Sequence, residues 1–181
     1  MFNDQYGLTK AVLSGYKTVT RRIMNRQPDP DDIAYMEPKD YPCQPPYKVG
    51  EIVAVAQCYA DIHSELMIGD FVDARYDSFK NAVVHDKAGW HNKMFVQADL
   101  MPHQIRITSV RPERLQDITD EDCLKEGVRF VENSDGYFSN GMSDGYTTPI
   151  SAFAALIDKI SGRRIWERNP FVWRIEFKLV K

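Results

Sequence analysis

The chain has 181 residues, of which 43% are hydrophobic and 27% charged, and its formal net charge is −3. This length buries one sizeable core, so we expect a single domain over residues 1–181. The acidic total argues against a protein that coats nucleic acid non-specifically, because such binding depends on many Lys and Arg contacts to phosphate.

No membrane, metal or cofactor partner is indicated. No apolar run approaches the ~20 residues of a membrane helix, and residues 1–4 lack the basic and hydrophobic regions of a secretory signal. We therefore expect a cytoplasmic protein. The cysteines are odd in number, widely separated and without a Cys-x-x-Cys pair: Cys43, Cys58 and Cys123. The histidines never show the i,i+4 spacing of a helical zinc pair: His63, His85, His91 and His103.

The N-terminal third predicts a helix, a strand and a long loop. Apolar spacing favours a helix over residues 4–14, which Gly15 ends in the left-handed conformation. The β-branched run that follows predicts a strand over 18–23. Six prolines exclude regular structure from 27–46.

Residues 49–111 are expected to form strands and irregular segments. A near-continuous apolar run predicts a buried strand over 49–59. Farther along, apolar and polar residues alternate over Phe71–Tyr76, which predicts a strand, and the composition of 89–93 predicts a loop. Residues 104–111 should form another strand.

A short capped helix is predicted near the middle of the chain. Thr119 is its expected N-cap, with Asp122 at the third position, and Gly127 its end. The apolar residues expected near one face are Cys123, Leu124 and Val128.

The C-terminal part alternates between irregular and regular structure. Residues 130–148 are rich in Gly, Ser, Asn and Asp, which predicts an irregular excursion and a candidate lid. Apolar residues recur at three- and four-residue spacing over 150–160, which predicts an amphipathic helix. A strand over 172–179 should close the sheet.

The chemically richest segment follows the first helix and reads Gly15-x-Lys17-Thr18-x-Thr20-x-Arg22. It places a lysine and hydroxyl groups beside two arginines where the chain changes direction. Taken alone, this pattern is typical of a basic, solvated strand edge.

The segment also resembles the Gly-x-Lys signature of ASCH domains, which are similar to the PUA RNA-binding fold. Three further blocks resemble that family in the right order: 47–55, 114–128 and 169–177. The chain is therefore identified as similar to the longer ASCH proteins of phage and prophage settings. The resemblance implies an α+β fold, in which helices flank a PUA-like small β-barrel with a mixed sheet, and insertions at about 60–100 and 129–150.

The resemblance also implies a chemistry. Small ASCH proteins include amidohydrolases that remove the acyl group from N4-acetylcytidine, and their lysine, threonine and glutamate match Lys17, Thr20 and Glu126. Lys17 is the expected base if its pKa is lowered by desolvation or by Arg21 and Arg22. Thr20 is then the nucleophile, and Glu126 orients Lys17 or moves the proton.

Six residues are candidates for binding substrate: Tyr16, Arg21, Arg22, Gln57, Tyr59 and Trp166. Arg22 matches a basic position of the motif and is expected to anchor substrate or stabilise an oxyanion. Gln57 stands where the longer group is expected to carry a carboxylate, and it can hydrogen-bond a base edge. Trp166, beside three arginines, is the best candidate for stacking a base.

Two alternatives remain open at this point. The first is a hydrolase of acylated or modified nucleosides; the second is a non-catalytic module that binds RNA or a modified base in the same cleft. The partner is a nucleoside or short RNA in either case. A third reading makes Lys17 and Glu126 a structural salt bridge, and strand periodicity places Lys17 and Thr20 on opposite faces unless the chain bulges between them.

Overall fold

The computed structural model describes residues 2–33, 35–37, 40–68, 71–139, 142 and 144–180, without the side chains of 68, 71 and 72. Six α-helices lie in this part of the chain: α1 (Leu8–Leu13), α2 (Tyr59–Leu66), α3 (Tyr76–Ala82), α4 (Asp120–Lys125), α5 (Pro149–Ser161) and α6 (Ile165–Arg168). The strands are β1 (Val19–Ile23), β2 (Ile52–Ala54), β3 (Met67–Ile68), β4 (Phe71–Val72), β5 (Gln104–Arg114), β6 (Val128–Val131), β7 (Gly136–Ser139) and β8 (Phe171–Leu179). Short 3-10 turns cover Ala98–Leu100, Leu115–Asp117 and Glu132–Ser134.

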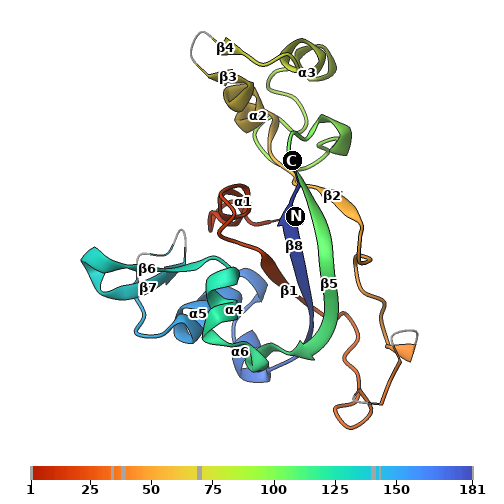
Figure 1. Cartoon of the computed structure of the whole chain (residues 1–181), viewed down its shortest axis with the longest axis vertical. Coiled ribbons are helices and arrows are strands. Elements are labelled where there is room, and N and C mark those ends of the chain that lie inside the picture. The colour runs from red at the N-terminus through yellow and green to blue at the C-terminus, as the bar shows by residue number, and fades with distance from the viewer. Residues whose placement is uncertain are drawn as a thin grey trace.

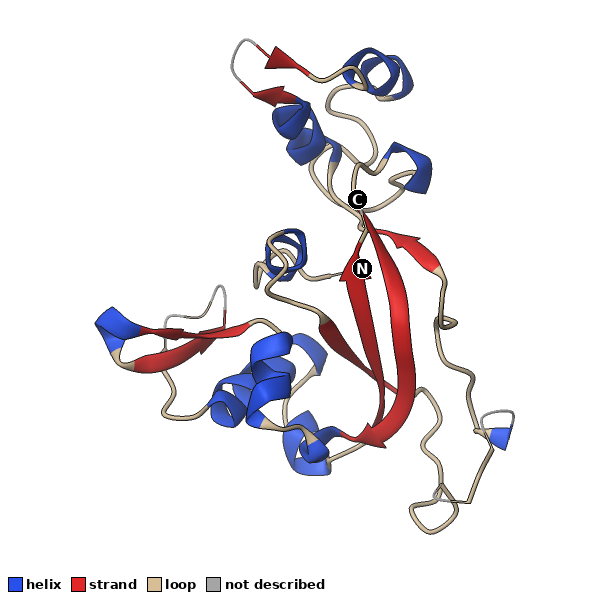
Figure 2. Cartoon of the chain, viewed as in Figure 1, coloured by secondary structure: helices blue, strands red, loops and turns tan. Residues whose placement is uncertain are grey.

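A four-stranded sheet in the order β1-β8-β5-β2 is the centre of the molecule (Figure 1). This sheet, together with the six described helices, confirms the predicted α+β class. The described strands pair antiparallel throughout, where a mixed sheet was expected. Strands β1 and β2 are the edges of the sheet, and the long strands β5 and β8 curve between them (Figure 2).

The two faces of this sheet differ in chemistry. Ile105 and Ile107 of β5 and Ile175 and Phe177 of β8 belong to one apolar core cluster. The opposite face carries arginines in register across three strands, because Arg21 pairs with Arg174 and Arg174 with Arg111. A register shift between Ile107 and Ser109 places one extra residue in β5, as in a β-bulge, which bends the strand.

Several predicted elements are confirmed with small changes at their ends. Strand β1, strand β8, helix α5 and the 104–111 strand lie where expected, and the last extends to Arg114. Helix α4 begins as predicted, since the Thr119 hydroxyl accepts a hydrogen bond from the backbone of Asp122. Gly127 then takes a left-handed φ of 103°. The predicted apolar face of α4 is wrong in one place, because Leu124 is exposed.

The first helix is shorter than predicted. It begins at Leu8, because Gly7 precedes it with a left-handed φ of 59° and residues 4–7 form turns. Its end is as expected, with Gly15 at a φ of 75°.

The predicted buried strand over 49–59 is wrong at both ends and in its burial, because residues 49 and 50 form a turn and Ile52 of the short edge strand is exposed. Strand β2 covers only Ile52–Ala54, and Tyr59 instead begins α2. The backbone there leaves the sheet: the Tyr59 N–H donates to the Gly89 carbonyl and the Ala60 N–H to that of Trp90. The strand predicted over Phe71–Tyr76 is likewise limited to β4, and Tyr76 begins α3.

The irregular excursion predicted over 130–148 is largely a hairpin. Strand β6 pairs with β7 from Val128↔Ser139 to Val131↔Gly136. Asp135 adopts a left-handed φ of 41° at the turn, and such conformations are tolerated by Asp without strong steric cost. Residues 140, 141 and 143 of the candidate lid lie outside the described part, as does Pro38 of the proline-rich loop.

Candidate functional site

The segment after α1 brings the predicted catalytic residues to the edge of the sheet. Gly15 ends α1, and Lys17 lies two residues before β1 begins at Val19. Its backbone N–H donates to the Ala11 carbonyl, which ties this corner to the helix. Glu126 arrives from the other side as the C-cap of α4.

Lys17 and Glu126 meet as a buried ion pair. Only 2% of the Lys17 surface is exposed. Its Nζ donates to the Glu126 carboxylate, to the Glu126 carbonyl at 2.9 Å and to the Val19 carbonyl at 2.8 Å. All three protons of an ammonium group therefore have an acceptor.

The Glu126 carboxylate is shared with Arg21. Arg21 donates from Nη1 to Glu126 Oε1 at 3.2 Å and from Nη2 to Asp122 Oδ2 at 2.6 Å. It also donates from Nε to Glu113 Oε1 at 2.7 Å. Arg21 thus links the lysine pair to a larger network on the charged face of the sheet.

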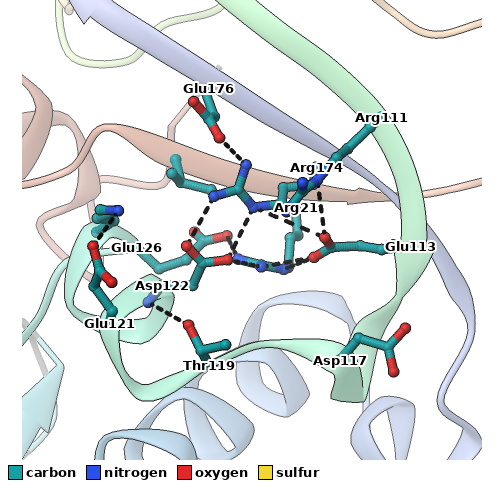
Figure 3. A network of polar contacts seen from close by, with 12 residues as sticks. Arg21, Arg111, Glu113, Asp117, Thr119, Glu121, Asp122, Glu126, Arg174 and Glu176 are labelled. Carbon is teal, nitrogen blue, oxygen red and sulfur yellow. Dashed lines mark hydrogen bonds and ion pairs between the residues drawn. The ribbon is translucent and has the colours of Figure 1, made fainter.

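Arg174 extends this network across the next strand (Figure 3). Its Nε and Nη2 bind the two oxygens of Asp122 at 2.9 and 2.8 Å, a bidentate arrangement. Its Nη1 binds Glu176. Three buried cations therefore face carboxylates from β5, α4 and β8, which offsets the repulsion between arginines opposite one another in the sheet.

Burial and charge set the pKa values in this network. Desolvation is the largest influence on Lys17 and lowers its pKa from 10.5; Glu126 opposes this, while Arg22 and Arg21 add to it. The two arginines therefore act in the direction expected from the sequence. Hydrogen bonds from Arg174 and Arg21 hold the pKa of Asp122 well below its usual range. Burial raises the pKa of the Cys123 thiol to about 12, so this cysteine is an inert thiol.

One cavity of about 620 Å³ is lined by all three proposed catalytic residues, Lys17, Thr20 and Glu126. We call it the site cavity. Arg21 and Arg22 line it as well, and helix α5 supplies an apolar wall through Phe153, Leu156 and Ile157. Its volume falls in the range of small-molecule sites.

Lys17 and Thr20 both line this cavity without the bulge that strand periodicity predicts as necessary. The register of β1 against β8 is regular from Val19 to Ile23, so Thr20 and Arg21 face opposite sides of the sheet. The cavity wraps around β1, an edge strand, and so is open to both faces. No hydrogen bond joins Lys17 to Thr20 in the described part of the chain.

The remaining predicted binding residues lie elsewhere. Tyr59 is buried in a separate core cluster, where its hydroxyl accepts the Gln97 N–H at 2.9 Å. Gln57 is also buried, and its amide donates to Glu65 at 3.2 Å. Trp166 packs against the core beside Phe153, and Tyr16 is exposed beneath the Arg129 guanidinium. None of these four is among the described residues that line the site cavity.

A second buried lysine at the site was not foreseen. Lys93 lines the site cavity, and its Nζ donates to Asp4 Oδ1 at 2.5 Å, to the Phe2 carbonyl at 3.1 Å and to the Thr9 hydroxyl. It reaches the site from the 60–100 insertion, in a stretch that reads as a polar loop. No local pattern in the sequence indicates this long-range contact.

The chain was compared with known proteins. No family model matches it, and no curated protein matches it. It is similar to the high-resolution crystal structure of an ASCH domain from Lactobacillus crispatus JV V101, with a TM-score of 0.38 and 13% identity over 99% of this chain and 76% of that one. The similarity is to an ASCH domain. At this level of likeness it assigns neither a family nor an activity.

Two further features bear on partners. In the described part of the chain, no helix is long and apolar enough to span a bilayer. No group of three or more His, Cys, Asp or Glu side chains there is placed to hold a metal ion.

Proposed function

We propose that the chain is an amidohydrolase acting on acylated or modified nucleosides of the N4-acetylcytidine type. The observation that carries this proposal is the convergence of Lys17, Thr20 and Glu126 on one cavity large enough for a nucleoside. The small size of the cavity and the acidic total charge favour a single nucleoside over long RNA.

The buried pair supplies a base whose proton can move. Desolvation favours neutral forms, so it assists transfer of a proton from the Lys17 ammonium to the Glu126 carboxylate. Arg21 remains bound to the other Glu126 oxygen and holds it in place. A neutral Lys17 amine is then able to accept a proton from the nucleophile.

Acyl transfer then proceeds through Thr20. Its oxygen bonds to the amide carbon, its proton passes to Lys17, and the carbonyl electron pair moves to oxygen beside Arg22. Collapse breaks the C–N bond while Lys17 returns the proton to the departing nitrogen. Water then hydrolyses the threonine ester, so that the net products are the amine and a carboxylic acid. Because Thr20 and Lys17 make no direct hydrogen bond, substrate or water in the site cavity must bridge them.

Incubation of the purified protein with N4-acetylcytidine and related acylated nucleosides tests this proposal, with product followed by chromatography. The wild type is expected to release cytidine. The double variant Lys17→Met/Glu126→Gln replaces the ion pair by neutral side chains of similar length and should fold without releasing product. The matched control Glu121→Gln/Lys125→Met removes an exposed ion pair from the same helix and should keep turnover.

A binding module is the second candidate, and one observation favours it. All three protons of Lys17 already have acceptors within the protein, which suits a fixed ammonium. In that case the wild type binds nucleosides in calorimetry but releases no product from any amide. Turnover by the wild type that survives in Lys17→Met/Glu126→Gln would contradict the proposed mechanism.

A further inference from the structure

A second cavity is lined by Thr20, the proposed nucleophile. Its volume is about 360 Å³, and we call it the inner cavity. The site cavity and the inner cavity are both lined by Phe2, Thr20, Arg22 and Lys93. Thr20 therefore stands at the junction of two adjoining spaces.

The inner cavity is the hollow of the curved sheet. All four strands of the sheet line it, with Ile105 and Ile107 from β5 and Ile175 and Phe177 from β8. Both edge strands also contribute, β1 through Thr20 and β2 through Val53. Because β1 and β2 do not pair with each other, the cavity occupies the gap between the two edges.

The chain outside the sheet completes the walls. Phe95 and Val96, from the 60–100 insertion, lie at the cavity together with Ala56. Phe95 has a left-handed φ of 65°, a conformation that is unusual for an aromatic residue. The insertion thus shapes this cavity with apolar side chains that the sheet itself does not provide.

The two spaces that meet at Thr20 differ in the charged residues that line them. The site cavity carries Lys17, Arg21 and Glu126, groups that suit the polar base and ribose of a nucleoside. The described lining of the inner cavity is mainly aliphatic and aromatic, and its charged members, Arg22 and Lys93, are shared with the site cavity. A ligand that spans both cavities would have its hydrogen-bonding groups in the site cavity and an apolar group in the inner cavity, joined near Thr20.

We propose that the inner cavity is an acyl subsite, and that the preferred substrates are nucleosides with an acyl group longer or bulkier than acetyl. This inference rests on the proposed function. With the amide carbon at Thr20, the nucleoside fills the site cavity and the acyl chain enters the inner cavity. Hydrolysis breaks the C–N bond, the nitrogen takes a proton, and the acyl group leaves as a carboxylic acid that contains the oxygen of water.

The length of the acyl chain tests the subsite. For N4-acetyl-, N4-butyryl- and N4-hexanoylcytidine, kcat/KM should rise about fourfold for each methylene that the cavity buries. Ala56→Leu adds a side chain into the inner cavity and should reduce the hexanoyl-to-acetyl ratio of kcat/KM by at least about tenfold. Ala82→Leu, an exposed change at the end of α3, should leave that ratio unaltered.

A second variant and a second readout separate failure of the subsite from failure of the hydrolase. Ala54→Val is a strand-compatible change in β2 that also narrows the cavity. Calorimetry with the same compounds reports binding where no turnover occurs. Affinity that increases with chain length, and loses this increase in Ala54→Val, supports the subsite even if no amide is cleaved. Turnover or binding that is indifferent to chain length overturns the subsite, and hydrolysis of N4-acetylcytidine would still leave the proposed function standing.

Discussion

At the scale of single residues, the least expected feature is that the Lys17 ammonium group has a hydrogen-bond acceptor for each of its three protons. The sequence is compatible with a salt bridge between Lys17 and Glu126, and the structure places Lys17 against both a carboxylate and two carbonyls. Burial of such a pair is costly, and removing Lys17 deprives the buried Glu126 carboxylate of one cationic partner. The same contacts that stabilise the ammonium also fix the proton relay on which the proposed reaction depends.

Removal of Lys17 alone should therefore destabilise the protein. Lys17→Met leaves Glu126 buried with Arg21 as its remaining cation, and the expected loss is about 3–5 kcal/mol in the free energy of unfolding. Addition of Glu126→Gln should restore part of that loss. Urea denaturation of the wild type and both variants measures this, and a single variant as stable as the wild type would mean that the pair is not buried as described.

The lowered pKa of Asp122 predicts that the stability of the fold depends on pH. Its pKa is lowered in the folded state, so the unfolded chain binds the proton more readily. The Asp122 carboxylate contributes its full stabilisation above its pKa in the unfolded chain, near 3.8. This stabilisation is lost as the pH falls through the lower pKa of the folded state. The free energy of unfolding should thus decrease below about pH 4, and Asp122→Asn should flatten that dependence.

Urea denaturation between about pH 7 and pH 2 checks this dependence. Asp31→Asn is the matched control, because Asp31 is exposed in the loop before β2. An equal acid slope in the wild type and Asp122→Asn would show that other carboxylates dominate the acid response.

At the scale of elements, local signals in the sequence predicted some segments well and others poorly. The N-cap Thr119 and Gly127 define α4, and both signals act within one helical turn. By contrast, α2 begins where an apolar run predicted continued strand. The backbone there pairs with Gly89 and Trp90, about 30 residues away in sequence, a contact that no local pattern encodes.

The candidate site likewise contains some features that local sequence signals predict and others that depend on long-range contacts. The positions of Lys17 and Thr20 relative to β1 follow from helix-stop and β-branched signals nearby. The arginine row could not be predicted, because it depends on the register of three strands and on a bulge in β5. Lys93 was missed for the same reason, since its partners lie in the N-terminal segment.

Lys93 provides the element-scale prediction. It ties the 60–100 insertion to the first residues of the chain through Phe2, Asp4 and Thr9. Lys93→Met should free that segment, so amide hydrogen exchange over residues 2–9 should become faster. The exposed Lys87→Met is the control and should not change exchange there. Unaltered protection in Lys93→Met would show that apolar packing alone holds the segment.

At the scale of the whole molecule, the chain joins a curved sheet to helices beside β1 and to a lobe formed by α2, α3, β3 and β4 beyond one end of the sheet (Figure 1). The positive charges near the site are largely paired with carboxylates, and the total charge is −3. Such a distribution suits a small ligand more than an extended polyanion.

Single-stranded RNA should accordingly bind weakly. The logarithm of the association constant should fall with the logarithm of salt concentration with a slope smaller in magnitude than about 2, since each phosphate contact to a single strand contributes about 0.7. Fluorescence anisotropy with a labelled oligonucleotide at several salt concentrations measures this slope. A steep dependence would indicate an extended RNA interface and favour the binding module.

The proposed chemistry depends most on the Thr20 hydroxyl, and its removal is the most direct test. Thr20→Val keeps a β-branched side chain in β1, while Thr18→Val makes the same change two residues earlier, outside the lining of the site cavity. The rate of cytidine release from N4-acetylcytidine should fall by at least about 100-fold in Thr20→Val and stay near the wild-type rate in Thr18→Val. Equal rates in the wild type and Thr20→Val would contradict Thr20 as the nucleophile and with it the proposed reaction.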